Sequence, residues 1–445
     1  MDSKTSPFQI VLLAVFVVLG IAGIIIFAMT SSGGATEDVG DVYLWGTYPE
    51  RSITTFLHDY GMEDRRTTTV QYTQKDPKTF YDDLAQALAA GQGPDIVITD
   101  HSHIEKLESM FSVIPFEAFP ARTFIDAYID ASTTSFIKNR GQETGIRAIP
   151  IVVDPLVMYW NRDIFARHAT PQAPKYWDEL FGIAETMTER SENGNIIVSG
   201  VALGEPSNVL HSKEIISAMI MQAGGDIIVR NQDDGKMEVR LARTDANSLS
   251  PAQSAMRFFT EFANPTKKRY SWNKSMPSSK ETFVKGDLAV YIGTASELKE
   301  ISEKNPNLNF DVAALPQLRG GTNTRLLTTG KMYAVAITKT GKNQTGGFAI
   351  AGAMSTGKAG EMLEKELGAP SAQRALLVPN ARDPLMTTLR QEAVRMRTWP
   401  DPDPEKTEDI LFRMVERITT GEDRISESVQ RADGEMKILV RDSGK

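Results

Sequence analysis

The sequence contains no cysteine. Disulfides, thiolate nucleophiles, iron–sulfur clusters and cysteine-ligated zinc are therefore excluded, and so is a lipid anchor attached to cysteine. The sequence also lacks an excess of positive charge. Its 57 acidic and 49 basic side chains leave a net charge of −8. Broad binding of nucleic acid needs a basic surface that neutralises phosphates, so this balance argues against it.

Long apolar runs are absent, with one exception at residues 8–29. In these 22 positions only Gln9 is polar. As a helix the run spans about 33 Å, which matches the ~30 Å hydrocarbon core of a bilayer. Fifteen of its residues are Leu, Ile, Val or Phe, and together they favour insertion by roughly 5 to 9 kcal/mol. We predict a transmembrane anchor here.

A cleaved signal peptide is the alternative interpretation of this run. Signal peptides have a shorter apolar region, about 7–15 residues, followed by a small-x-small site. Residues 28–30, Ala-Met-Thr, match that site poorly, so an uncleaved anchor is favoured. Lys4 precedes the run and Glu37 and Asp38 follow it. The positive-inside rule then places residues 1–7 in the cytoplasm and the remainder outside, after a flexible linker at 30–40.

The remaining ~405 residues alternate short apolar runs with helical periodicity, which is typical of α/β folds. They exceed what one hydrophobic core usually serves. Strands are predicted at 41–45, 67–72, 95–99, 196–203, 288–292, 310–314 and 332–337. Helices are predicted at 52–60, 78–90, 120–139, 174–188, 213–223 and 251–263, with further helices from 346 to the end. An extended segment at 146–159 contains Pro150 and Pro155, and we interpret it as a chain crossing between two lobes.

Motifs of catalysis and cofactor binding are weak. Residues 352–359 (GAMSTGKA) approach the phosphate-binding loop, but Ala359 lacks the hydroxyl that would hold magnesium. Asp100, His101 and His103 form the one dense histidine and carboxylate cluster. A metal site there is conceivable, but an N-cap at a helix start explains the same residues more simply. We predict neither an enzyme nor a metal or cofactor.

Several segments, in order, resemble the extracellular solute-binding proteins of ABC importers, in the sugar-binding family that includes maltose-binding protein. The matching segments are 93–97 (GPDIV), 158–165 (MYWNRDIF), 173–180 (APKYWDEL), 283–290 (FVKGDLAV), 314–316 (ALP) and 414–439 near the C-terminus. The resemblance covers about residues 41–440. Two departures are the uncleaved anchor and Trp160, where the family usually has tyrosine.

The resemblance implies a two-lobed α/β fold that closes by a hinge around a ligand. The expected N-lobe comprises 41–150 and 331–380, and the C-lobe comprises 151–330 and 381–445. The implied function is that of a monomeric, membrane-anchored protein that binds a carbohydrate and delivers it to the permease subunits of an importer. Closure around a ligand shifts an existing balance between open and closed states.

A sugar site needs flat aromatic faces and a few polar groups. Open α/β sheets bind ligands beyond the carboxyl ends of their strands, so residues at strand ends and in polar loops are the candidates. The predicted ligand-binding residues are Trp45, Tyr48, Asp100, His101, Asp154, Trp272, Gly293, Thr294 and Trp399. Trp45 and Trp272 have a core position as their alternative, and Asp154 has a structural role in the hinge.

Two other functions remain open from the sequence. One is a sensor or binder of another solute, such as a peptide, a polyamine or a metal; iron would have to use Tyr48, His101 and His103. The other is a secreted hydrolase, which would lose turnover when a single carboxylate is changed. The sequence does not name the ligand or the permease.

Overall fold

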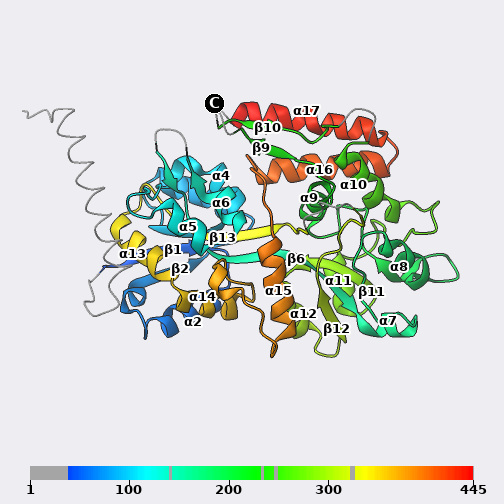
Figure 1. The fold of residues 1–445 in the computed structure, drawn as a ribbon, viewed down its shortest axis with the longest axis horizontal. Helices are drawn as coiled ribbons and strands as arrows, with labels where there is room; N and C mark the ends of the chain where they lie inside the picture. Colours follow the sequence, from blue (N-terminus) through cyan, green and yellow to red (C-terminus); the bar gives the residue numbers. More distant parts are fainter. Residues whose placement is uncertain (1–38, 140–142, 232–234, 245–248, 321–325, 444–445) are drawn as a thin grey trace, which may run out of the picture. The chain divides into compact units, whose positions relative to one another are not determined.

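The computed structural model describes residues 39–139, 143–231, 235–244, 249–320 and 326–443. The predicted anchor at 8–29 lies outside these residues. Within the described ranges, no helix has the length and apolar character needed to cross a membrane. The chain divides into two compact units, and several of their helices and strands are labelled in Figure 1.

The chain passes between the units more than once. Unit 1 contains the described residues up to Val152, with Met332–Leu367 and Ser371–Leu376. Unit 2 contains Val153–Lys331, Gly368–Pro370 and the residues from Leu377 onward. The first passage falls within the segment that the two prolines mark in the sequence.

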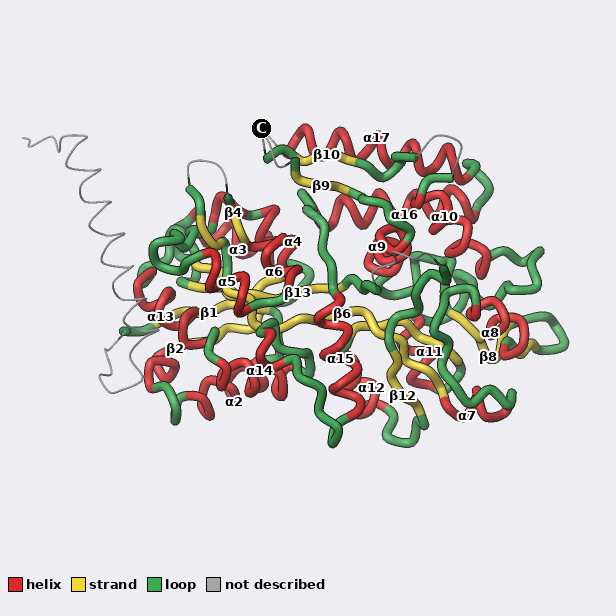
Figure 2. The backbone as a smooth tube through the Cα atoms, in the orientation of Figure 1, coloured by secondary structure: helices red, strands yellow, loops and turns green. Residues whose placement is uncertain are grey.

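Unit 1 is built on the strand order β2-β1-β3-β13, in which β1 is parallel to β2 and β3, and β13 is antiparallel to β3. Helices lie on both sides of these strands, with α2 and α14 on one side and α4 and α6 on the other (Figures 1 and 2). The strands are β1 Val42–Gly46, β2 Val70–Gln74, β3 Ile96–Asp100, β4 Ile137–Lys138, β5 Gly145–Ile146 and β13 Gly330–Ile337. The helices are α2 Glu50–Tyr60, α3 Phe80–Ala89, α4 His101–Lys106, α5 Ala121–Ala127, α6 Asp130–Phe136, α13 Gln344–Met354 and α14 Gly357–Leu367.

Unit 2 is built around β6, which pairs antiparallel with both β11 and β12, while β11 is parallel to β8. The strands are β6 Ile149–Asn161, β7 Glu189–Arg190, β8 Ile196–Val201, β9 Ile228–Arg230, β10 Met237–Val239, β11 Leu288–Thr294 and β12 Phe310–Ala313. The helices are α7 Arg162–Arg167, α8 Glu179–Met187, α9 Ser212–Gln222, α10 Pro251–Phe259, α11 Ser279–Lys285, α12 Glu297–Lys304, α15 Pro384–Arg395, α16 Pro404–Thr419 and α17 Ile425–Ser443. The 3₁₀ turns are η1 Arg65–Thr69, η2 Glu108–Met110, η3 Thr260–Ala263 and η4 Arg374–Leu376.

Strand β6 is continuous through Pro150 and Pro155, and all of its residues are buried. The segment is extended, as the sequence predicts, and the two prolines do not break the strand. Near the prolines, β6 forms hydrogen bonds with residues outside the regular strand pairs. The N–H of Val153 donates to the carbonyl of Pro370, and the N–H of Leu156 donates to the carbonyl of Thr329. A proline without an N–H is tolerated where no ladder partner needs that donor.

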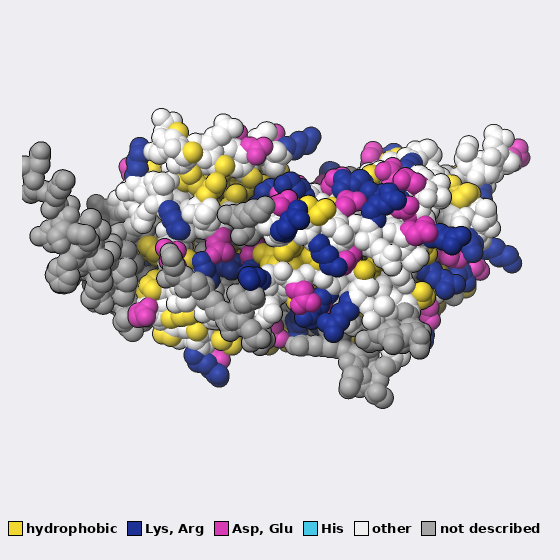
Figure 3. Space-filling view, turned by 90° about the horizontal axis from the view of Figure 1, so that it is seen from above, with side chains coloured by type: hydrophobic (Ala, Val, Ile, Leu, Met, Phe, Trp, Pro, Cys, Tyr) yellow, Lys and Arg dark blue, Asp and Glu magenta, His cyan; other side chains and the backbone are white. Residues whose placement is uncertain are grey.

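Helix α17 is amphipathic and closes the core of unit 2. It buries Val429, Ala432 and Met436 completely and packs on α16 and α10. Its outer side carries ion pairs, including Arg413 and Arg417 of α16 with Glu435. Basic and acidic side chains accordingly intermingle over this face of unit 2 (Figure 3), as expected for a solvated helix surface.

Gly330 provides a test of the backbone packing in unit 2. A Cβ placed on it would lie 2.2 Å from the carbonyl oxygen of Asp154, so backbone would have to move. We expect Gly330→Ala to lower the free energy of unfolding by about 1–3 kcal/mol, measured by urea denaturation. The matched control is Gly182→Ala in α8, where a Cβ meets nothing within 4 Å. That change should be neutral or stabilise by up to ~1 kcal/mol, and equal losses at both positions would contradict the packing argument.

Candidate ligand-binding site

In unit 1 the carboxyl ends of three parallel strands meet at one sheet edge, where ligands bind in open α/β sheets. Trp45 and Gly46 end β1, Gln74 ends β2 and Asp100 ends β3. Because β13 is antiparallel to β3, its first residues reach the same edge, and Tyr333 lies opposite Asp100 in the register.

Aromatic rings gather at this edge of unit 1. Trp45, Tyr48 and Tyr333 are each half-buried, and the rings of Tyr48 and Tyr333 lie 5.0 Å apart. The ammonium of Lys75 lies 3.5 Å from the centroid of the Trp45 ring, which is cation–π distance. Trp45 and Tyr48 thus lie at the end of β1 and in the loop that follows it.

Asp100 acts as the N-cap of α4. Its Oδ1 accepts hydrogen bonds from the N–H groups of Ser102 and His103 at 3.0 and 3.2 Å. Its Oδ2 is 2.7 Å from Nδ1 of His103 and accepts from the Tyr81 hydroxyl. Asp100 is 6% exposed, so the capping interpretation of this cluster is confirmed, and a direct contact with a ligand is not supported.

His101 begins α4 and is half-buried. Its Nδ1 accepts a hydrogen bond from the N–H of Met332, at the start of the returning strand. In the described part of the chain, no group of three or more His, Asp or Glu could hold a metal ion.

In unit 2 the parallel strands β8 and β11 end at a common edge, and β6 begins there, with Leu156 opposite Thr294. Asp154 is buried at this edge. Its Oδ1 accepts from the N–H of Ser296 and its Oδ2 from the Ser296 hydroxyl, both at 2.7 Å. Burial raises the pKa of Asp154, against these hydrogen bonds. The carboxylate joins β6 to the start of α12, which is the structural role left open as its alternative.

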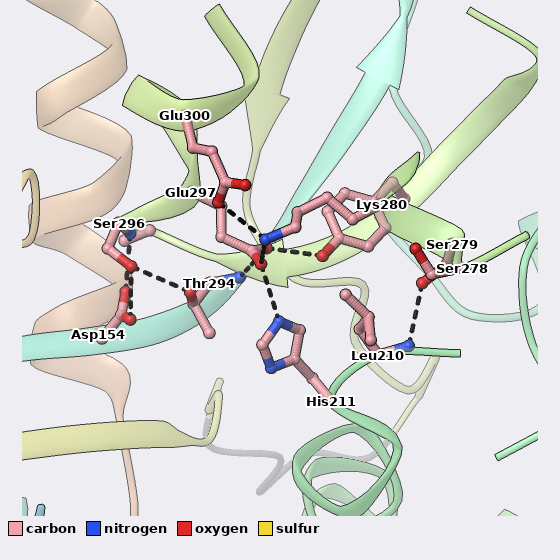
Figure 4. Close-up of polar contacts among 12 residues, drawn as sticks. Asp154, Leu210, His211, Ser278, Ser279, Lys280, Thr294, Ser296, Glu297 and Glu300 are labelled. Carbon is pink, nitrogen blue, oxygen red and sulfur yellow. Dashed lines mark hydrogen bonds and ion pairs between the residues drawn. The ribbon is translucent and has the colours of Figure 1, made fainter. Parts of the chain in front are cut away.

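A second carboxylate, Glu297, lies next to this pair (Figure 4). Its Oε2 accepts from the Tyr291 hydroxyl at 2.6 Å and from the N–H of Thr294 at 3.2 Å. Its Oε1 is 3.2 Å from Nε2 of His211 and 3.2 Å from Nζ of Lys280. Burial alone would raise the pKa of Glu297, but His211 and Lys280 outweigh it and lower the pKa to about 2.

Gly293 and Thr294 were expected to present backbone N–H groups to a ligand. The N–H of Thr294 donates to Glu297 instead. Both residues are buried in β11, and a Cβ on Gly293 would lie 2.3 Å from Oε2 of Glu297. The prediction that Thr294 offers its N–H to a ligand is therefore wrong, because a neighbouring carboxylate satisfies that donor. Gly293 makes room for that carboxylate.

Trp272 was expected to stack on a ligand, and this prediction is also wrong. The side chain is fully buried in the core of unit 2, and its Nε1 donates to Oδ1 of Asn208 at 2.7 Å. A ring without accessible surface cannot present a face to a solute. The polar residues around Trp272 suggested an exposed ring, but the indole points inward from that loop.

Trp399 is half-buried and packs against the same core. Its Nε1 donates to the hydroxyl of Ser217 in α9. The ammonium of Lys213 lies 5.4 Å from the ring centroid and also pairs with the buried carboxylate of Asp401 at 2.5 Å. These contacts attach residues 399–404 to α9 and explain the position of Trp399 without a ligand.

The sequence reading missed two residues. Tyr333 reaches the aromatic edge only because β13 returns antiparallel beside β3. Glu205 follows β8 and is 7% exposed, and among the described residues its Oε2 has no hydrogen-bond partner. Burial raises the pKa of Glu205, with Lys274 opposing. Its position after an apolar strand and Gly204 could have indicated Glu205 from the sequence.

Comparison with known proteins identifies the class. A sequence profile of the bacterial extracellular solute-binding protein family matches residues 62–359. The chain belongs to this family, which confirms the resemblance seen in its motifs, and it is a binding protein rather than an enzyme. No curated protein matches the sequence.

Solved structures of solute-binding proteins share the fold at low sequence identity. An ABC transporter solute-binding protein of Thermotoga lettingae, bound with α-D-tagatose, has a TM-score of 0.67 at 16% identity, covering 90% of this chain and all of that one. The maltose-maltodextrin binding protein of Alicyclobacillus acidocaldarius gives 0.66 at 15%, covering 89% and 100%. The GacH receptor of Streptomyces glaucescens gives 0.69 at 16%, covering 91% and 99%. These neighbours confirm the two-lobed α/β fold.

The buried position of Trp272 predicts a stability effect that a ligand contact would not have. Trp272→Ala should lower the free energy of unfolding by about 3–5 kcal/mol, through the cavity and the lost hydrogen bond. Trp45→Ala, at a half-buried ring, should cost clearly less. Chemical denaturation of both variants compares them, and an unchanged midpoint for Trp272→Ala would contradict the core assignment.

The lowered pKa of Glu297 predicts acid sensitivity. A carboxyl group whose pKa is lower in the folded than in the unfolded state stabilises above its unfolded value and loses that contribution as the pH falls. Stability should therefore fall between about pH 4.5 and 2, by an amount on the order of 3 kcal/mol from this group. Glu297→Gln should flatten that part of the curve of unfolding free energy against pH. If the variant loses the same unfolding free energy as the unaltered protein over this pH range, other carboxylates cause the effect.

Proposed function

We propose that this protein is a membrane-anchored solute-binding protein of an ABC importer that binds a carbohydrate between its two lobes. Membership of the family supports the general role. The sugar assignment is supported by the structural neighbours, one bound with α-D-tagatose, one named for maltose and maltodextrin, and one in complex with acarbose. The observation that carries the proposal is the pair of Tyr48 and Tyr333 rings, 5.0 Å apart, at the carboxyl edge of unit 1, where β1 also ends with the half-buried Trp45.

Unit 1 is proposed to supply the stacking half of the site. The C–H face of a sugar packs on aromatic rings, and its hydroxyls need polar partners nearby. The half-buried rings of Trp45, Tyr48 and Tyr333 are suited to the first task. Lys75, held over the Trp45 ring, and His101, which follows β3, are suited to the second.

Unit 2 is proposed to supply polar contacts. Glu205 has a carboxyl oxygen without a hydrogen-bond partner among the described residues. Because that oxygen is buried, a sugar hydroxyl would reach it only after the side chains around it rearrange on binding. Trp399, whose ring is half-buried, is the remaining aromatic candidate of this unit.

Closure of the lobes around the solute is proposed as the signal that the permease reads. A ligand that contacts both lobes favours the closed state, and it shifts the balance by its difference in affinity for the two states. The permease subunits are the expected partners. The binding domain would lie outside the cell membrane, attached by the single span at 8–29, with the N-terminus in the cytoplasm.

The sugar assignment predicts saturable binding. The full-length protein in detergent, titrated calorimetrically with maltose, maltotriose, acarbose and α-D-tagatose, should bind at least one of them with micromolar or tighter affinity. Trp45→Ala should weaken that binding about tenfold, equivalent to ~1.4 kcal/mol. Tyr43→Ala is the matched control, on the same side of β1 but 44% exposed, and should leave affinity unchanged. No heat with any of these sugars would favour a sensor or a binder of another solute.

The anchor predicts membrane association that resists carbonate extraction. Val17→Arg with Leu19→Arg places two charges near the middle of the run, each costing about 2.5–3.5 kcal/mol on insertion. We expect the double variant to leave the membrane pellet, while Ser31→Arg, outside the run, stays in it. A shorter mature chain that starts after residue 29, seen by intact mass spectrometry, would identify a cleaved signal instead.

A further inference from the structure

A buried polar chain in unit 2 has no part in the proposed sugar contacts. It runs from Asp154 on β6 through Ser296 and Thr294 to Glu297 and then to His211 at the start of α9 (Figure 4). It therefore connects the segment where β6 leaves unit 1 with the first turn of a helix that packs in the core of unit 2.

The backbone of His211 is strained. Its φ of 59° and ψ of 25° lie in the left-handed region, which is unfavourable for a residue that has a Cβ atom. As the N-cap of α9 it makes no side-chain capping hydrogen bond. The conformation directs the imidazole away from the helix and toward Glu297. A contact that holds the ring there also holds the strained start of α9.

The acceptor side of this contact is rigid. The hydroxyl of Tyr291, the N–H of Thr294 and the ammonium of Lys280 all bind the carboxylate of Glu297. The carboxylate also packs tightly against Gly293, where an added Cβ would lie 2.3 Å from Oε2 of Glu297. Glu297 therefore stays in place whether or not His211 carries a proton, and any movement must occur on the side of α9.

The first turn of α9 is also linked to the strands that begin at this edge. The hydroxyl of Thr329 donates to the carbonyl of Glu214 at 2.7 Å. The carbonyl of Thr329 in turn accepts from the N–H of Leu156 on β6, at 2.8 Å. Helix α9 thus reaches β6 by two routes, one through Glu297 and Asp154 and one through Thr329. If the contact of His211 with Glu297 is lost, the connection through Thr329 is the one of the two that remains.

We propose that the His211 imidazolium is a proton-dependent latch that holds the first turn of α9 to the β11–α12 corner and, through Asp154, to β6. The latch is strongest when the ring is charged, and it weakens when the ring is neutral, because the hydrogen bond from Nε2 to Glu297 is then no longer charge-assisted. The inference goes beyond the proposed function, because it depends neither on the solute nor on a partner.

The charges around His211 determine the direction of the effect. The charged groups that act on His211 itself are Glu297 of α12, Glu214 of α9 and Lys331 of β13. The titratable groups around these partners are Lys280 of α11, Tyr291 of β11, Asp154 and Tyr159 of β6, Glu300 of α12 and Lys213 of α9. Burial alone would lower the pKa of His211, but Glu297 and Glu214 outweigh both burial and Lys331 and raise it. A raised pKa means that the contribution is complete below the unfolded value of 6.5 and is lost as the pH rises through the folded value.

Hydrogen exchange of the full-length protein in detergent, without added solute, tests the latch. Rates are measured at several pH values from 6 to 9.5 and corrected for the intrinsic pH dependence of exchange. We expect exchange at the start of α9 to accelerate about tenfold across the transition, equivalent to ~1.4 kcal/mol, because the hydrogen bond to Glu297 is then no longer charge-assisted. Exchange in α2 of unit 1 should stay constant.

Variants separate the latch from general loosening. His211→Asn removes the titrating ring but accepts the left-handed backbone, so it should exchange fast at the start of α9 at every pH. His58→Asn, at an exposed histidine of α2, should retain the pH dependence of the unaltered protein. If His211→Asn fails to fold, the NMR titration of the five histidine rings still decides. The proposal predicts one histidine ring with a pKa above 6.5 that titrates over the same pH range in which exchange at α9 changes. If no ring does so, the proposal is overturned.

Discussion

Parallel strand order is the constraint on which the site of this protein depends. Strands that run side by side in one direction end at one edge, and the chain must leave the sheet there through loops and helix starts. In unit 1 this constraint gathers Trp45, Tyr48 and the cap residue Asp100. In unit 2 it gathers Asp154 and the turn that follows Thr294. Residues far apart in sequence become neighbours because each directly follows or precedes a strand.

The two edges solve different physical problems. Unit 1 leaves the rings of Trp45, Tyr48 and Tyr333 half-buried. Unit 2 buries charged groups, and each must be paired or hydrogen-bonded because desolvation of an unpaired charge is costly. Glu297 meets this demand with a hydroxyl, a backbone N–H and two basic groups. Glu205 does not among the described residues.

Periodicity predicted most of the elements. The helix expected at 52–60 is α2, that at 213–223 is α9, and the strand expected at 288–292 is β11 with two further residues. Two predictions were less accurate. Residues 67–69 form part of a 3₁₀ turn capped by Asp64, before β2 begins at Val70. The single helix expected at 120–139 is divided into α5 and α6, because Tyr128 and Ile129 pair with residues 372–373 of a distant segment.

Local patterns in the chain were sufficient for the α/β class, the family, the apolar run and the strand ends where a site belongs, because these depend on short-range periodicity and on motifs in order. Side-chain direction was not accessible in this way. Trp45 follows an apolar strand and Trp272 lies in a polar loop, and both positions suggested access to solvent. One ring is half-buried at a sheet edge, whereas the other fills the core. That difference arises from long-range packing, such as the Asn208 amide that meets the Trp272 indole. The same holds for His211, whose strained backbone and charged partner become neighbours only after α9 and α12 have packed in unit 2.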